Sequence, residues 1–195
     1  MKFALFLLGS WTEPEPSEQS RIFGEMMEQI EYAEELGFDS VWIAEHHSSR
    51  YGICPSLMPL VTHVAARTKR IRIGTGVSVL PFYNPIYLAE ETAMMDVLSN
   101  GRLDFGVGRG STVYEYGNFN IDYESRNARF QEALDIILGL WTTPRFSYSG
   151  EFYQVNGLTI APSPVQRPHP PVYLAVSRTP ESVDVAVSRD LPILT

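Results

Sequence analysis

The chain has 195 residues, of which 44% are hydrophobic and 19% charged, and its formal net charge is -8 at pH 7. This composition suits one folded domain, or part of a larger one, and excludes intrinsic disorder. The negative charge argues against nucleic acid or an anionic membrane as the main partner. No apolar run approaches the ~20 residues that span a bilayer. The single cysteine, Cys54, excludes an internal disulfide framework, so we expect a soluble cytoplasmic protein.

The first half of the chain alternates apolar strand patterns with amphipathic helix patterns. In chain order the sequence predicts strand 2–8, helix 20–36, strand 39–44, helix 55–68, strand 71–79 and helix 84–99. Asn84-Pro85 supplies an N-cap and a first-turn proline for the third helix, and Asn100-Gly101 ends it.

The second half continues this alternation with one interruption. The predicted order is strand 103–107, helix 126–141, hairpin 146–155, proline-rich loop 161–171, strand 172–176, a short helix from 179, and strand 191–195. We interpret residues 142–171 as a hairpin-and-loop insertion within a single domain that covers residues 1–195. Long excursions of this kind often contact substrate, so we expect the insertion to form part of a lid.

Repeated strand–helix units with nearly continuous apolar strands predict a parallel sheet covered by helices, in the α/β class. A doubly wound sheet and a (β/α)8 TIM barrel both fit this pattern. The barrel is favoured because candidate site residues follow every strand, whereas a doubly wound sheet gathers its ligand at one switch point. The chain supplies about six of the eight strands that a barrel needs. We therefore expect an incomplete barrel and favour the N-terminal part of a longer protein.

Glu45-His46-His47 follows the second predicted strand. Histidine titrates near neutral pH, so this triplet suits acid/base catalysis or hydrogen bonding to an anionic intermediate. A hydrogen-bonded structural pair of histidines is the alternative. Adjacent histidines rarely bind one ion, and no second cluster completes a ligand set, so the sequence predicts no metal.

Glycines and arginines occupy the ends of the next two strands. Gly74 and Gly76 indicate a bulge or a close backbone approach of a ligand, with inward packing of small residues as the alternative. Arg109 lies between Gly108 and Gly110, where a guanidinium can hold a phosphate while the backbone closes around it. Arg126 offers a second cation at the start of the following helix, with a surface salt bridge as the alternative.

Ser177 and Arg178 follow the fifth predicted strand. Thr179 as an N-cap and Pro180 in the first turn then predict a helix start, whose N–H groups and dipole suit an anion. Two arginines and this helix N-terminus at one face of a barrel predict a phosphate pocket.

These residues lie in motifs that resemble the bacterial luciferase-like flavin-dependent monooxygenases. The motifs are Gly37-Phe38-Asp39-Ser40-Val41-Trp42, Glu45-His46-His47, Ile73-Gly74-Thr75-Gly76-Val77, Leu98-Ser99-Asn100-Gly101-Arg102, Phe105-Gly106-Val107-Gly108-Arg109-Gly110 and Pro171-Val172-Tyr173. The resemblance runs from Met1 to Thr195. It implies a (β/α)8 barrel and a dimer that uses O2 and reduced FMN, supplied by a separate flavin reductase, to oxygenate a small organic substrate.

The resemblance also implies roles for individual residues. His46 matches the family's active-site histidine, and Glu45 is the second catalytic candidate. The Gly76–Val77 junction matches a non-prolyl cis peptide under the flavin ring. The residues implied to bind the cofactor are Gly76, Val77, Gly108, Arg109, Arg126, Ser177 and Arg178.

Two departures from the light-emitting subunit matter. Gly108 stands where that subunit has a reactive cysteine, and Ser177 replaces a carboxylate. Both argue against light emission, and Gly108 implies extra space near the ring for another substrate. Two alternatives stay open: an F420-dependent oxidoreductase of the same fold, and a non-catalytic flavin-binding or partner subunit.

Overall fold

The computed structural model describes residues 1–12, 15–176 and 180–195. Its strands are β1 (Ala4–Leu7), β2 (Ser40–Ile43), β3 (Arg72–Thr75), β4 (Ser78–Val79), β5 (Leu103–Gly108), β6 (Phe146–Ser149), β7 (Gln154–Leu158), β8 (Val172–Ala175) and β9 (Ile193–Leu194). Its α-helices are α1 (Ser17–Glu35), α2 (Leu57–Arg67), α3 (Pro85–Leu98), α4 (Val113–Asn118), α5 (Arg126–Thr142) and α6 (Pro180–Ser188). Two 3-10 helices, η1 (Leu80–Phe82) and η2 (Tyr123–Ser125), complete the elements of the described residues.

The main sheet is parallel, and its strands follow one another in sequence order. The order is β1-β2-β3-β5-β8-β9, with the short β4 beside β5. A doubly wound sheet would reverse this order at its switch point, whereas a barrel adds each new strand to the same edge. The topology therefore agrees with the predicted incomplete barrel.

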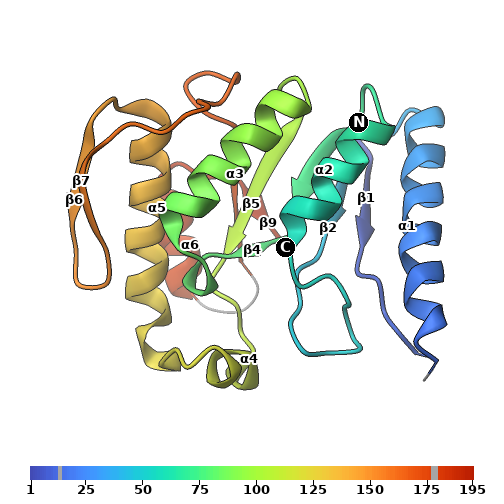
Figure 1. Ribbon diagram of the computed structural model, residues 1–195, viewed down its shortest axis with the longest axis horizontal. Helices are drawn as coiled ribbons and strands as arrows, with labels where there is room; N and C mark the ends of the chain where they lie inside the picture. The colour runs from blue at the N-terminus through green and yellow to red at the C-terminus, as the bar shows by residue number, and fades with distance from the viewer. Residues whose placement is uncertain (13–14, 177–179) are drawn as a thin grey trace.

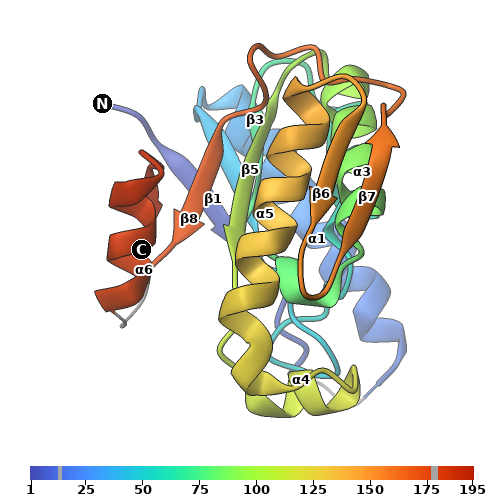
Figure 2. The ribbon, with the colours of Figure 1, turned by 90° about the vertical axis from the view of Figure 1, so that its left-hand side faces the viewer.

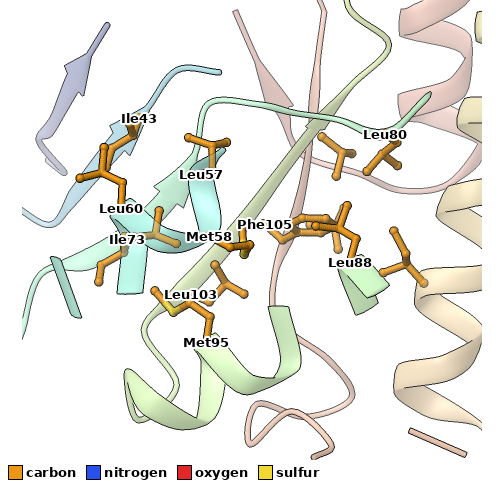
Figure 3. Close-up of a cluster of buried hydrophobic side chains, with 14 of the residues drawn as sticks. Ile43, Leu57, Met58, Leu60, Ile73, Leu80, Leu88, Met95, Leu103 and Phe105 are labelled. Atoms are coloured by element: carbon orange, nitrogen blue, oxygen red, sulfur yellow. The ribbon is translucent and has the colours of Figure 1, made fainter. Parts of the chain in front are cut away.

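Helices cover one face of this sheet and build the core with it. Figure 1 shows α2, α3 and α5 side by side across the sheet, with α1 beyond β1. The buried side chains that meet between the layers are labelled in Figure 3: Ile43, Ile73, Leu103 and Phe105 from strands, and Leu57, Met58, Leu60, Leu88 and Met95 from helices. The N-cap predicted for α3 is confirmed, since the Asn84 side chain accepts hydrogen bonds from Ile86 N and Tyr87 N. The predicted N-cap Thr179 lies outside the described residues.

The predicted strand 71–79 is divided in two, as β3 and β4. Gly74 pairs with Asp104 and Ser78 with Val107, so four steps along this segment match only three along β5. One extra residue is therefore accommodated between β3 and β4, as in a β-bulge. The peptide bond between Gly76 and Val77 is cis, as the resemblance implied.

Glycines on the opposite face of the sheet make room for an indole. A Cβ atom on Gly74 would lie 2.3 Å from Trp42 Cδ2, and one on Gly106 would lie 2.0 Å from the Thr75 carbonyl oxygen. The Trp42 ring also meets Tyr173 edge-on at 5.0 Å between centroids. Of the predicted roles, inward packing therefore accounts for Gly74.

The hairpin within residues 142–171 is not part of the main sheet. Strands β6 and β7 form a separate antiparallel hairpin, which Figure 2 shows outside α5. The Glu132 carboxylate on α5 attaches this hairpin to the helix. It accepts hydrogen bonds from the backbone N–H groups of Glu151 (2.7 Å) and Phe152 (3.0 Å). These hydrogen bonds hold the hairpin against α5, and the lid role of the insertion stays a prediction.

Candidate active site

A pocket of about 490 Å³ opens where the parallel strands end, a volume typical of small-molecule sites. Its wall takes side chains from segments far apart in sequence, including Glu45, His46, Arg109, Glu115 and Arg126. Figure 1 shows α4 at the end of the molecule toward which the arrows of β1 and β5 point. The structure thus brings the predicted histidine and both predicted arginines to one cavity.

The Glu45 carboxylate is fully buried and forms its hydrogen bond with His47 rather than with His46. Its Oε1 lies 3.0 Å from His47 Nε2, and its Oε2 accepts a hydrogen bond from the Tyr83 hydroxyl at 2.7 Å. Val79 N donates to the same carboxylate at 3.4 Å. Burial raises the pKa of Glu45 above its ordinary value, although these hydrogen bonds oppose the shift.

His46 faces a different carboxylate, that of Glu115. His46 Nδ1 lies 3.5 Å from Glu115 Oε1, which also accepts a hydrogen bond from His47 N at 3.1 Å. The Glu115 side chain is only 4% exposed, whereas that of His46 is 28% exposed and lines the pocket. Sequence reasoning missed Glu115, because α4 is a short helix between two loops and has no amphipathic period.

Both predicted arginines line the pocket and are held by polar or aromatic neighbours. Arg109 donates from Nη1 to Asn127 Oδ1 at 2.6 Å and from Nη2 to the Ser182 hydroxyl. The Arg126 guanidinium lies over the Tyr123 ring, 4.0 Å from its centroid. The predicted salt bridge alternative for Arg126 is also present, to Glu124 at 3.7 Å, but the Glu124 side chain is 82% exposed. Such an exposed pair contributes little to stability.

An aromatic cluster on α4 supports this wall. The Tyr116 ring packs edge-on against Phe82 (4.7 Å) and Tyr123 (5.2 Å), and its hydroxyl donates a hydrogen bond to the Arg109 carbonyl oxygen. Because Tyr123 in turn lies under Arg126, one packed cluster positions the segments that carry both guanidinium groups.

Gly76, Val77 and Gly108 line the pocket and form its apolar floor. A Cβ atom on Gly108 would lie 2.6 Å from Val77 Cγ2, so the Val77 side chain fills the space that was expected to be open there. An apolar floor beside two guanidinium groups suits an apolar ring that carries a phosphate.

Ser177 and Arg178 lie outside the described residues. Ala175 and Ser182 line the pocket from the same side of the sheet. In the described part of the chain no group of three or more His, Cys, Asp or Glu side chains could hold a metal ion. Nor does a helix in that part have the length and apolar character needed to cross a membrane.

A sequence model described as "luciferase-like monooxygenase" matches residues 1–195. The oxygenase component of a flavin-dependent trigonelline monooxygenase from Acinetobacter baylyi is 37% identical over 189 residues, 96% of this chain and 52% of the relative. An F420-dependent glucose-6-phosphate dehydrogenase from Amycolatopsis mediterranei is 36% identical over 158 residues, 77% of this chain and 47% of that protein. The chain thus spans about half the length of these curated relatives.

Solved structures show the same fold. The crystal structure of the monooxygenase RslO1 from Streptomyces bottropensis matches with a TM-score of 0.93 and 33% identity, over 100% of this chain and 59% of that chain. The oxygenating constituent of 3,6-diketocamphane monooxygenase from Pseudomonas putida, in complex with FMN, matches with a TM-score of 0.88 and 21% identity, over 99% and 56%. The chain therefore forms part of a luciferase-like barrel and belongs to the luciferase-like monooxygenase family.

Proposed function

We propose that this chain is the flavin-binding part of a two-component monooxygenase, which uses reduced FMN and O2 to oxygenate a small organic substrate. The observation that carries the proposal is the convergence of His46, Arg109 and Arg126 on one pocket with an apolar floor. Among the relatives, the trigonelline enzyme is named as flavin-dependent and the diketocamphane enzyme holds FMN, which supports the choice of cofactor.

Arg109 and Arg126 would hold the phosphate, with the Gly76–Val77 segment and Gly108 beneath the ring. Guanidinium groups suit this task because they pair with phosphate through two hydrogen bonds at once. Reduced FMN, when bound, would supply the electrons that activate O2.

His46 is the residue that we assign to proton transfer at the reacting centre. Its Nδ1 faces the buried Glu115 carboxylate, which leaves Nε2 as the ring atom that can exchange a proton with the reactants. Glu45 has a positioning role, because its hydrogen bonds with Tyr83 and His47 fix the segment that carries His46.

The remaining features of the system are proposed on the resemblance and on the relatives. A separate flavin reductase fits the words "oxygenase component" in the name of the trigonelline enzyme. A homodimer is carried over from the family resemblance alone. A cytoplasmic location agrees with the single cysteine.

The F420-dependent relative gives a specific reason to keep a second candidate, a hydride-transferring oxidoreductase on the same fold. Anaerobic titration with reduced FMN and with reduced F420, followed by absorbance, separates the two. The monooxygenase proposal predicts tight binding of FMN and no turnover of F420. The reverse result would favour the second candidate, and binding of FMN without any oxygenation would favour the non-catalytic flavin-binding subunit.

The His46→Ala variant tests the proposed chemistry. We expect it to bind reduced FMN almost as well as the wild type and to oxygenate about 10²–10⁴-fold more slowly, the usual loss for an acid/base group. The measurement is transfer of isotopically labelled oxygen to trigonelline, used as the first probe substrate. Unchanged turnover would remove His46 from the mechanism.

A further inference from the structure

A second pocket of about 320 Å³ is lined in part by His46. It is lined by Trp11, His46, Ser49, Arg50, Ile53 and Pro55, among others. His46 is the one residue, within the described part of the chain, that lines both this pocket and the proposed flavin pocket. A molecule bound there would contact the imidazole that we assign to proton transfer.

Hydrogen bonds between two strand-end loops build this pocket. Trp11 N donates to the Arg50 carbonyl oxygen at 2.8 Å, and Ile53 N donates to the Gly9 carbonyl oxygen at 3.1 Å. The Ser10 hydroxyl donates to the Tyr51 carbonyl oxygen at 2.7 Å. Residues 9–11 and 50–53 are therefore fixed to each other, and the pocket lies between them.

The charge of the pocket comes from Arg50. Its guanidinium lies 4.5 Å from the centroid of the Trp11 ring, and no carboxylate of the described residues pairs with it. The pocket-lining side chains in that part of the chain include no Asp or Glu. In a chain with net charge -8, such a cation at a pocket wall favours an anionic ligand.

The remaining walls are aromatic or apolar. The His46 ring meets Tyr51 edge-on at 5.1 Å, and Ile53 and Pro55 contribute apolar surface. Gly52 packs against the imidazole so closely that an added Cβ would lie 2.8 Å from His46 Cδ2. The orientation of His46 is thus set by the same loop that carries Arg50.

We propose that this pocket is the subsite for the organic substrate and that it takes a small aromatic carboxylate. The carboxylate would pair with Arg50 and the ring would lie between Trp11 and His46. The inference rests on the proposed function and adds the substrate class to it.

Benzoate and its neutral counterpart benzamide are the probes, with calorimetric titration of the whole chain as the measurement. We expect the wild type to bind benzoate at least about tenfold more tightly than benzamide, because hydrogen bonds between charged groups are stronger than those to a neutral amide. Arg50→Ala should lose this preference. Arg67→Ala is the matched control, because Arg67 is an exposed arginine of α2 that lines neither pocket.

Reduced FMN is titrated into the same samples to separate the two proposals. Arg50 is exposed, so its alanine variant should fold and bind FMN as the wild type does. FMN binding with no preference for benzoate, or with a preference that survives in Arg50→Ala, would overturn the subsite alone. Failure of the wild type to bind FMN would overturn the proposed function, and with it the assignment of this pocket to the substrate of a monooxygenase.

Discussion

The two adjacent histidines of the triplet contact different carboxylates in this structure. His47 pairs with Glu45 inside the core, and His46 faces Glu115 at the pocket wall. His47 is thus the buried, hydrogen-bonded residue of the triplet, and His46 is the one that lines the pocket, where the proposed proton transfer requires it to be. A buried carboxylate behind an imidazole fixes which ring nitrogen is free to react.

The Glu115→Gln variant tests this division. The amide side chain would keep an oxygen for the His47 N–H but lose the negative charge beside His46. We expect oxygenation to slow by about tenfold or more, with FMN binding almost unchanged. Rates and FMN affinities are compared with those of Glu35→Gln, which alters an exposed residue of α1. Equal rates in the two variants would show that Glu115 has no part in positioning His46.

The buried Glu45 predicts how stability depends on pH. Burial raises its pKa in the folded state above the ~4.3 of an unfolded chain, so its contribution is fully present below that value. The contribution is lost as pH rises through the folded pKa, because the carboxylate must then be buried as an anion. The free energy of unfolding of the wild type, measured in urea relative to Glu45→Gln, should therefore fall as the pH rises above about 4. A difference that does not change with pH would contradict the raised pKa.

At the scale of elements, the long periodic segments were predictable and the irregular ones were not. The Asn84-Pro85 start of α3 was predicted correctly, because its cap is local chemistry. The break between β3 and β4 depends on pairing with β5, which is distant in sequence. Helix α4 is held by rings from η1 and η2, so its own residues give little sign of it.

Close packing of the strands gives a direct test at this scale. Gly106→Ala would place a Cβ 2.0 Å from the Thr75 carbonyl oxygen. Relief of this contact would require the backbone of the sheet to move. We expect a loss of about 1–3 kcal/mol in the free energy of unfolding. Gly24→Ala in α1 meets nothing within 4 Å, and should instead stabilise by roughly 0.5–1 kcal/mol. Urea unfolding measures both, and equal effects would refute the packing of Gly106.

At the scale of the whole molecule, the sequential strand order explains why the site is composite. Each parallel strand ends at the same edge, so residues from Glu45 to Ser182 meet in one pocket. That convergence was predictable once a barrel was inferred, and it placed His46, Arg109 and Arg126 correctly together. The partners Glu115, Tyr123 and Asn127 were not predictable, because loop geometry rather than periodicity brings them there.

The most direct test of the account is the affinity for FMN compared with that for riboflavin, which lacks the phosphate. The wild type should prefer FMN, and Arg109→Ala and Arg126→Ala should each reduce that preference by about 10-fold to 100-fold, as expected for a lost charged hydrogen bond. Riboflavin binding should stay the same in these variants, and Arg67→Ala should behave as the wild type. A preference for FMN that is equal in the wild type and both pocket variants would contradict a flavin phosphate held by Arg109 and Arg126.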